Sequence, residues 1–310
     1  MTEHYTENPE NIQKITPYII AEPCEMITQI FTDGICVCYD TCSFRRHANL
    51  DTDEALCIAK YIKAKNGCVV LFRCILMELA SHSGVLNQEY IEYIRFLYEN
   101  DIPVLVMYEE SLYDVLNVVF STNERINQHL CWAVRNTAGS VGPIAEILDQ
   151  NEQLKNIVKK GQKLNQRNIY TLFFSTVRKN KKSGDDLGEG ILAVCMYLLS
   201  VLPGEDGKFC VLTDDKNAAG KLYDINQKTV QKAGTKKTVI VSTPKLAQMM
   251  YREKIVTEKA SLIKILSSGT SGNVVILGAT IYDLKAQIIS CTCGELAEQI
   301  ITPNQISIIF

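Results

Sequence analysis

The chain has 310 residues, of which 46% are hydrophobic and 22% are charged, and its formal net charge is -3 at pH 7. This composition is typical of a folded globular protein and excludes disordered, collagen-like and coiled-coil classes. No apolar run approaches the roughly 18 residues that a membrane-spanning helix needs. The N-terminal residues are polar and lack the apolar core of a secretory signal. We therefore expect a soluble cytoplasmic protein whose 12 cysteines are mostly buried, reduced thiols.

The small net charge hides a strong asymmetry along the chain. Residues 1–154 carry a net charge of -12, residues 155–259 carry +10, and residues 260–310 carry -1. The most basic stretch is 155–182, with nine basic residues and no acidic one. Such a stretch is either a solvated helix surface or a surface that contacts the phosphates of a nucleic acid.

The first third of the chain alternates strand-like and helix-like patterns. An apolar, β-prone run over 35–40 predicts a buried strand, and apolar residues at helical spacing predict a helix over 51–65. The stretch 67–84 begins as a strand and ends as a helix. An amphipathic helix over 88–100 then precedes a strand over 102–108. Alternation of this kind is typical of an α/β protein with a parallel sheet.

From about 110 to 184 the pattern is helical, without a convincing strand. Further elements follow in the order helix, strand, strand and helix, at 187–202, 208–215, 238–243 and 244–254. We therefore predict a three-layer α/β/α domain over 30–259, with a parallel sheet and a long helical insert at about 110–184.

The last 51 residues change in character, because alternating β-rich sequence replaces the helical pattern. Residues 273–293 alternate apolar and polar side chains, a short helix follows, and 305–310 ends the chain as a strand. We predict a small C-terminal α+β unit over 260–310.

The acidic residues fall at informative positions. Asp40 closes the first predicted strand, and Asp214 and Asp215 close a later one. In open parallel sheets, ligands bind outside the carboxyl ends of the strands, so these side chains are expected at one edge. Glu78 lies on an otherwise apolar helix, and Glu189 opens another helix. We expect these two helices to bring their carboxylates to the same edge.

Carboxylates that converge on one edge repel each other unless they share a cation. Their hard oxygen atoms suit Mg²⁺ or Mn²⁺, and such a site activates water for an in-line attack on a phosphodiester. Each acid also has a plain structural explanation: Asp40 and Asp214 are placed to cap helices, and Glu189 to favour a helix N-terminus. Glu78 is the hardest to explain in this way, because its neighbours are apolar or small.

The order of these motifs resembles the PIN-domain family of nucleases. The first-strand aspartate, the helical glutamate, the Gly-Glu helix start, the Asp-Asp pair and the closing strand and helix each have a counterpart. The matching segments are YDTCSF (39–44), CVVLFRCILMELASHSG (68–84), DDLGEGILAVCMYLL (185–199), VLTDDKNAAGKL (211–222) and VIVSTPKLAQMM (239–250). The resemblance covers about 30–110 and 184–256. The stretch 110–184 is longer than the family usually carries, and 260–310 has no counterpart in it.

The resemblance implies a metal-dependent endoribonuclease that hydrolyses RNA phosphodiester bonds with Mg²⁺ or Mn²⁺. Carried over by position, Asp40 is the first metal ligand, Glu78 the second acid and Glu189 the third. Asp214 is the fourth, with Asp215 as the alternative. Single-stranded RNA is the expected substrate.

The basic stretch is then expected to form a wall that guides RNA, with its interleaved aromatic residues either stacked on bases or packed in a core. Candidate phosphate contacts are Arg178, Lys179, Lys181, Lys182, Lys216 and Lys221. The helical insert and the C-terminal unit are equally suited to forming a homo-oligomer or holding a partner. The alternative interpretation is a catalytically inactive, PIN-derived binding or assembly protein, because folds often keep a surface after losing chemistry.

Overall fold

The structure, a computed structural model, describes residues 5, 7–81, 83–182, 184–233, 238–270 and 272–310. Its centre is a five-stranded parallel sheet in the order β3-β2-β1-β4-β5. The strands are β1 (Ile35–Tyr39), β2 (Gly67–Phe72), β3 (Val104–Met107), β4 (Phe209–Leu212) and β5 (Val239–Val241). All five fall within predicted strands, so the predicted α/β class with a parallel sheet is confirmed.

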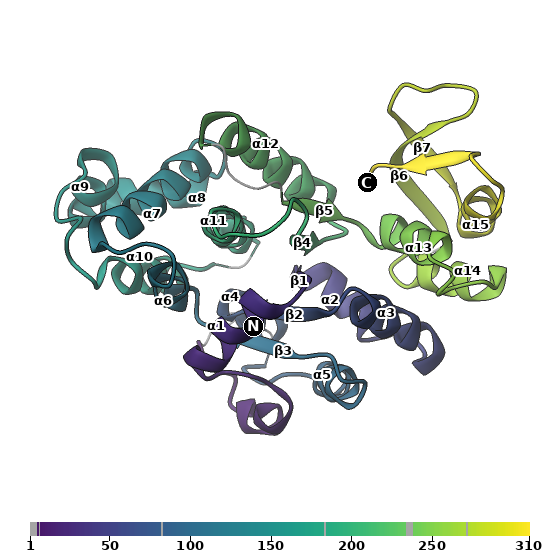
Figure 1. The fold of residues 1–310 in the computed structure, drawn as a ribbon, viewed down its shortest axis with the longest axis horizontal. Helices are drawn as coiled ribbons and strands as arrows, with labels where there is room; N and C mark the ends of the chain where they lie inside the picture. Colours follow the sequence, from purple (N-terminus) through teal and green to yellow (C-terminus); the bar gives the residue numbers. More distant parts are fainter. Residues whose placement is uncertain (1–4, 6, 82, 183, 234–237, 271) are drawn as a thin grey trace.

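Helices cover both faces of this sheet, as the predicted three-layer core requires. The strand order runs one way from β1 to β3 and the other way from β4 to β5, so right-handed crossovers place helices on opposite faces. One face carries α3 (Thr52–Ala64) and α5 (Gln88–Glu99), and the other carries α11 (Leu187–Ser200) and α12 (Lys216–Ala233) (Figure 1). Helix α13 (Thr243–Arg252) follows β5 and packs against α3. The order reverses between β1 and β4, which is where ligands bind in such sheets.

Two short helices start directly at the carboxyl ends of strands. Helix α2 (Thr41–His47) follows β1, and α4 (Arg73–Leu79) follows β2 without an intervening loop. The two helices pack against each other. Side chains at their first turns are therefore held at the edge of the sheet by short, rigid connections.

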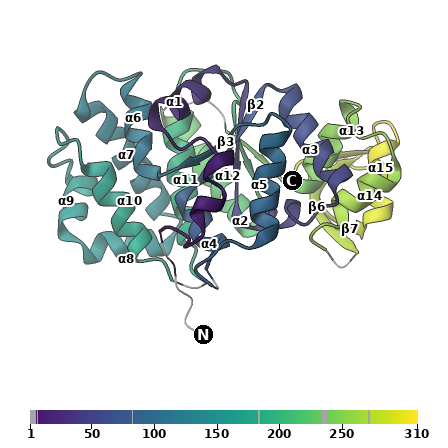
Figure 2. The ribbon, with the colours of Figure 1, turned by 90° about the horizontal axis from the view of Figure 1, so that it is seen from below.

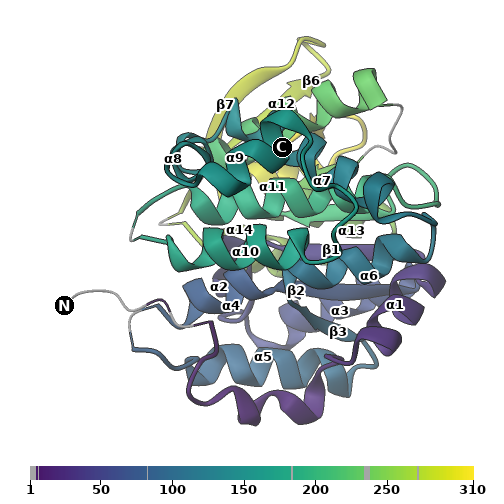
Figure 3. The same cartoon turned by 90° about the vertical axis from the view of Figure 1, so that its left-hand side faces the viewer.

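The stretch between β3 and α11 is helical, as predicted. It contains one 3₁₀ turn, η3 (Glu109–Ser111), and five helices. The helices are α6 (Leu112–Asn117), α7 (Asn123–Ala138), α8 (Gly142–Gln150), α9 (Glu152–Lys160) and α10 (Ile169–Lys179). Helix α7 packs along α11, and Figure 3 shows α10 and α11 on the near side of the sheet. Tyr170, Phe173 and Phe174 of α10 are each at most 1% exposed, so they pack in the core and offer no ring to a base.

The C-terminal unit is of the predicted α+β type and consists of a three-stranded antiparallel sheet with two helices. It comprises α14 (Lys259–Ser267), β6 (Asn273–Thr280), β7 (Gln287–Thr292), α15 (Cys293–Ile301) and β8 (Ile306–Ile308), with the strand order β7-β6-β8. The buried Gln248 of α13 donates to the carbonyl of Ile306 and accepts from the amide of Ile308. Figure 2 shows this unit at one end of the molecule and α6 to α10 at the other.

The N-terminal segment also packs on the core, although the predicted domain starts only at residue 30. It contains the 3₁₀ turns η1 (Ile12–Lys14) and η2 (Thr16–Tyr18) and the helix α1 (Pro23–Thr32). Ile15, Met26 and Ile30 are buried. Ile20 forms a parallel bridge with Leu105, so this segment lies along the outer edge of β3.

The cysteines lie mainly in the core. All twelve are free thiols, and only Cys24 is exposed. Cys36 and Cys38 lie two residues apart on β1, so they share one face of the sheet, and both are fully buried. Among the helices in the described ranges, none is long and apolar enough to cross a membrane.

Candidate active site

An acidic pocket of about 400 Å³ opens at the carboxyl ends of β1 and β4. Its lining includes five carboxylates, which come from Asp40, Glu78, Asp185, Glu189 and Asp215. The cationic side chains in the lining are those of Arg45 and Lys181. Four separate segments of the chain thus bring an excess of negative charge to one place, and we call this pocket the acidic cleft.

A second groove of about 520 Å³ adjoins the acidic cleft and shares Glu189 and Asp215 with it. Its other walls include Lys216 and Lys221 from the first turns of α12. The two hollows therefore have a wall in common, and two lysines stand in the second of them.

Asp40 is the N-cap of α2 and lies deep in the cleft, with 8% exposure. Its Oδ1 accepts from the amide of Thr41 at 2.8 Å, and its Oδ2 accepts from Thr213 Oγ1 at 2.8 Å and from Cys42 Sγ at 2.9 Å. Burial raises the pKa of Asp40, while these hydrogen bonds act in the opposite direction. The capping role expected from the sequence is therefore present, and the same carboxylate also lines the cleft.

Glu78 sits beside Asp40 and is held from two sides. Its Oε2 accepts from Thr41 Oγ1 at 2.5 Å, and its Oε1 lies 3.0 Å from Lys181 Nζ. Lys181 also contacts Asp185 Oδ1 at 2.6 Å. Burial alone would lower the pKa of Lys181, but Glu78 and Asp185 together raise it above its ordinary value.

Gly188 makes room for the Glu78 carboxylate. A Cβ atom at this position would lie 2.2 Å from Glu78 Oε1, which is far closer than ordinary contact. The absence of a side chain at the start of α11 therefore permits the approach of α4. This role was not predicted from the sequence, where the glycine directly before Glu189 was the available signal.

Glu189 faces the junction of the cleft and the second groove. Its Oε2 lies 3.0 Å from Lys221 Nζ, and the same ammonium lies 2.5 Å from Asp186 Oδ2. Burial raises the pKa of Glu189, and Lys221 opposes this shift. Glu189 thus lines the cleft, and its carboxylate has a cationic partner.

The two consecutive aspartates after β4 have different environments. The Asp214 side chain is 3% exposed and lies 3.2 Å from Arg46 Nη1. It also accepts from Ser43 Oγ at 2.8 Å, and from the amide and hydroxyl of Thr243 at 2.7 and 2.6 Å. Asp214 therefore ties α2 to the start of α13 and does not line the cleft. Asp215, the predicted alternative, lines it and accepts from the first amides of α12.

The predicted phosphate contacts occupy three kinds of position. Arg178 is buried at 1% exposure of its side chain, where it pairs with Glu109 and Glu110. Its position gives a nucleic acid no access to the guanidinium. Lys181 lies inside the acidic cleft, and Lys221 lies at its junction with the second groove. The side chains of Lys179, Lys182 and Lys216 are exposed.

The donor chemistry of the cleft fits Mg²⁺ or Mn²⁺, since carboxylate and hydroxyl oxygens are the ligands that these hard ions prefer. Among the residues that the structure describes, however, no three Asp, Glu, His or Cys side chains come together closely enough to hold a metal ion. The ion pairs explain this, because Glu78 is turned towards Lys181 and Glu189 towards Lys221. The ammonium of Lys181 in the cleft and that of Lys221 at its junction with the second groove thus each pair with a carboxylate that a metal ion would need.

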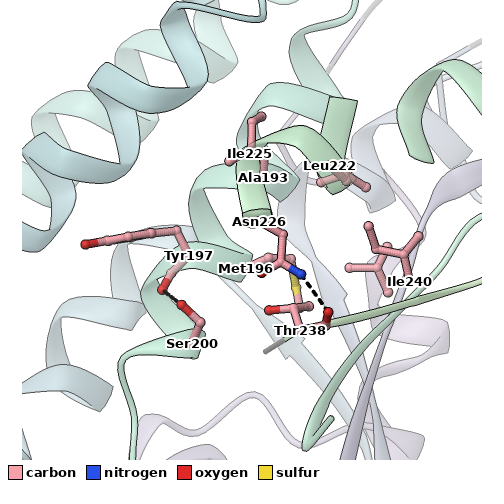
Figure 4. A pocket seen from close by; sticks show the side chains of 10 residues that line it. Ala193, Met196, Tyr197, Ser200, Leu222, Ile225, Asn226, Thr238 and Ile240 are labelled. Atoms are coloured by element: carbon pink, nitrogen blue, oxygen red, sulfur yellow. Dashed lines mark hydrogen bonds between the residues drawn. The ribbon is translucent and has the colours of Figure 1, made fainter. Parts of the chain in front are cut away.

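A separate apolar gap of about 20 Å³ lies between α11, α12, β4 and β5 (Figure 4). Its walls include Met196, Leu222 and Ile225, and the side-chain amide of Asn226 donates to the carbonyl of Thr238 at its margin. This volume holds about one water molecule. The gap is therefore a packing feature and not a substrate site.

Comparison of the chain with models of protein families, with curated proteins and with solved structures gives no match.

Proposed function

We propose that this protein is a metal-dependent endoribonuclease that hydrolyses RNA phosphodiester bonds in the acidic cleft with Mg²⁺ or Mn²⁺. The observation that carries the proposal is the convergence of five carboxylates from distant segments, against two cationic side chains, in one open pocket. Such an excess of buried negative charge destabilises a fold, and a shared divalent cation offsets it. The order of the motifs, which resembles that of PIN-domain nucleases, supports the same reaction.

Asp40, Glu78, Glu189 and Asp215 are the residues that would hold the metal. A bound divalent cation would lower the pKa of a water molecule and stabilise the charge of the phosphoryl oxygens. Thr41 contributes by fixing the Glu78 carboxylate through its hydroxyl. Asp214 acts indirectly, since it connects α2 and α13 on either side of the strand end that carries Asp215.

A polymeric substrate fits the surroundings better than a small phosphate ester. The cleft shares a wall with a second groove, and this groove is lined by Lys216 and Lys221, which are suited to contact further phosphates of a chain. The exposed Lys179 and Lys182 lie just before the segment that lines the cleft. Cationic side chains along a path favour a nucleic-acid backbone.

The proposal is tested by cleavage of single-stranded RNA with Mn²⁺ or Mg²⁺ by the purified protein. Asp40→Asn and Asp215→Asn each remove a charge from the cleft and are expected to reduce cleavage by at least about a hundredfold without unfolding the protein. The control is Asp53→Asn, because this exposed residue in the first turn of α3 does not line the cleft. Full cleavage by the Asp40→Asn variant would overturn the proposal.

A second candidate is a non-catalytic binding or assembly module with the same fold. It is favoured by the two lysines that already neutralise Glu78 and Glu189 without a metal ion. Calorimetric titration with Mn²⁺ discriminates between the candidates, since the module is expected to bind no metal and to leave RNA intact.

A further inference from the structure

Lys181 lies inside the acidic cleft, where a cation is required, and not on a wall that faces solvent. Its side chain is 5% exposed, and its Nζ contacts Glu78 Oε1 at 3.0 Å and Asp185 Oδ1 at 2.6 Å. The same ammonium donates to the backbone carbonyl of Asp185 at 3.2 Å, and the ring of Tyr5 lies 5.4 Å away. One buried ammonium thus pairs with two carboxylates and offsets one of their two negative charges.

The segment that carries Lys181 is itself firmly held. Asp185 accepts from the amide of Lys182 at 2.7 Å and from the amide of Leu187 at 3.2 Å. These bonds fold the connection between α10 and α11 back on itself. The Asp185 carboxylate thus holds both the backbone next to Lys181 and the ammonium of Lys181 itself, which keeps this ammonium in the cleft.

Lys221 repeats the arrangement on the other side of Glu189 but is held less tightly. It also bridges two carboxylates, those of Asp186 and Glu189, yet its side chain is 26% exposed. Within the described part of the chain, no ion pair joins Asp40 or Asp215 to a cationic side chain. Of the five carboxylates of the cleft, those of Asp40 and Asp215 are thus open to a cation, and the other three are already paired with a lysine.

We propose that Lys181 is an internal competitor for the divalent cation, which reaches Glu78 only by displacing the lysine ammonium. This inference rests on the proposed function, because it requires that the cleft take a divalent cation. Glu78 Oε2 already accepts a hydrogen bond from Thr41, and Oε1 is the oxygen that faces Lys181 across the cleft. Lys181 holds that same oxygen, and two cations on one carboxylate oxygen repel each other.

The test is a calorimetric titration of the purified full chain with MnCl₂ alone, which measures metal binding and needs no activity as a readout. Lys181→Met is expected to bind Mn²⁺ about tenfold more tightly than the wild type, or better, because the competitor is removed. Lys182→Met makes the same change of charge on an exposed neighbour and is expected to bind as the wild type does. Lys181→Arg keeps the positive charge and is expected to bind Mn²⁺ as weakly as the wild type does.

Removal of Lys181 leaves Glu78 and Asp185 without their cation, so thermal unfolding is measured with and without Mn²⁺. Mn²⁺ is expected to raise the Tm of Lys181→Met more than that of the wild type. Equal Mn²⁺ affinity of the two proteins would overturn the role of Lys181 while leaving the proposed function intact. If neither protein binds Mn²⁺, the proposed function fails as well. If Lys181→Met is unfolded and Mn²⁺ does not restore it, the inference is also overturned.

Discussion

Replacement of Gly188 by alanine tests the geometry of the acidic cleft with a single methyl group. The new Cβ would lie 2.2 Å from Glu78 Oε1, whereas ordinary contact begins at 3.4 Å. The carboxylate must therefore retreat by about 1.2 Å. The oxygen that moves is the one that contacts Lys181, so the change alters the site without removing any of its charges.

The expected effect of Gly188→Ala on stability is small, because the clashing atom is the end of a flexible side chain. Alanine in a helix is favoured over glycine by up to about 1 kcal/mol, which offsets the displacement of Glu78. Activity is expected to fall by about a hundredfold, since a misplacement of about 1 Å at a catalytic group has effects of this size. Unfolding in urea and cleavage of single-stranded RNA measure the two quantities separately.

Gly142→Ala is the matched control, because a Cβ atom there meets nothing within 4 Å. It makes the same chemical change at the start of another helix and is expected to leave both stability and cleavage nearly unchanged. Full activity of Gly188→Ala would mean that the position of Glu78 does not matter for the reaction, and the assignment of Glu78 to the site would fall. A large loss of stability would instead refute the view that the carboxylate can move aside.

The remaining predictions concern stability. Arg178→Ala leaves the fully buried Glu109 without its cation and is expected to lower the free energy of unfolding by about 3–5 kcal/mol. Lys179→Ala, on the exposed neighbour, is expected to change it little. Equal free energies of unfolding for the two variants in urea would refute the buried ion pair. His47 is fully buried, and burial lowers its pKa from 6.5 to about 4. The unfolded chain therefore binds a proton more readily than the fold, so stability is full above pH 6.5 and falls by about 3 kcal/mol as the pH drops towards 4. Urea unfolding across this pH range measures the loss, and His47→Gln is expected to show a weaker dependence.

Most of the fold follows from hydrophobic periodicity in the sequence. The strands β1 and β2 are continuous buried runs, and α5 has a clear apolar stripe, so their positions are determined locally. The packing of residues 8–32 on the sheet was not predicted, because the segment forms only short turns, one helix and an isolated bridge. Such contacts depend on the edge of β3, which is some 85 residues away in the chain.

The site was predictable in its composition but not in its pairings. Asp214 and Asp215 are neighbours in sequence. Only the contacts with Ser43 and Thr243 reveal that the Asp214 side chain points into the protein interior, so that Asp215 is the one that lines the cleft. For Arg178, a signal was present and was missed. Tyr170, Phe174 and Arg178 are spaced by four residues on α10, so they share one face of the helix, and the first two are apolar and buried. The spacing therefore indicated a buried arginine that needs a carboxylate.

The bridge between Ile20 and Leu105 has a consequence for how the molecule behaves among its own copies. An uncovered outer strand presents free amide and carbonyl groups to which any extended chain can add. The amide of Ile20 donates to the carbonyl of Val104, and the carbonyl of Ile20 accepts from the amide of Val106, so these groups on the margin of β3 are already used. A shortened chain that begins at residue 30 would expose this margin of β3. Aggregation of such a chain would then result from the uncovered strand edge and not from a change in the acidic cleft.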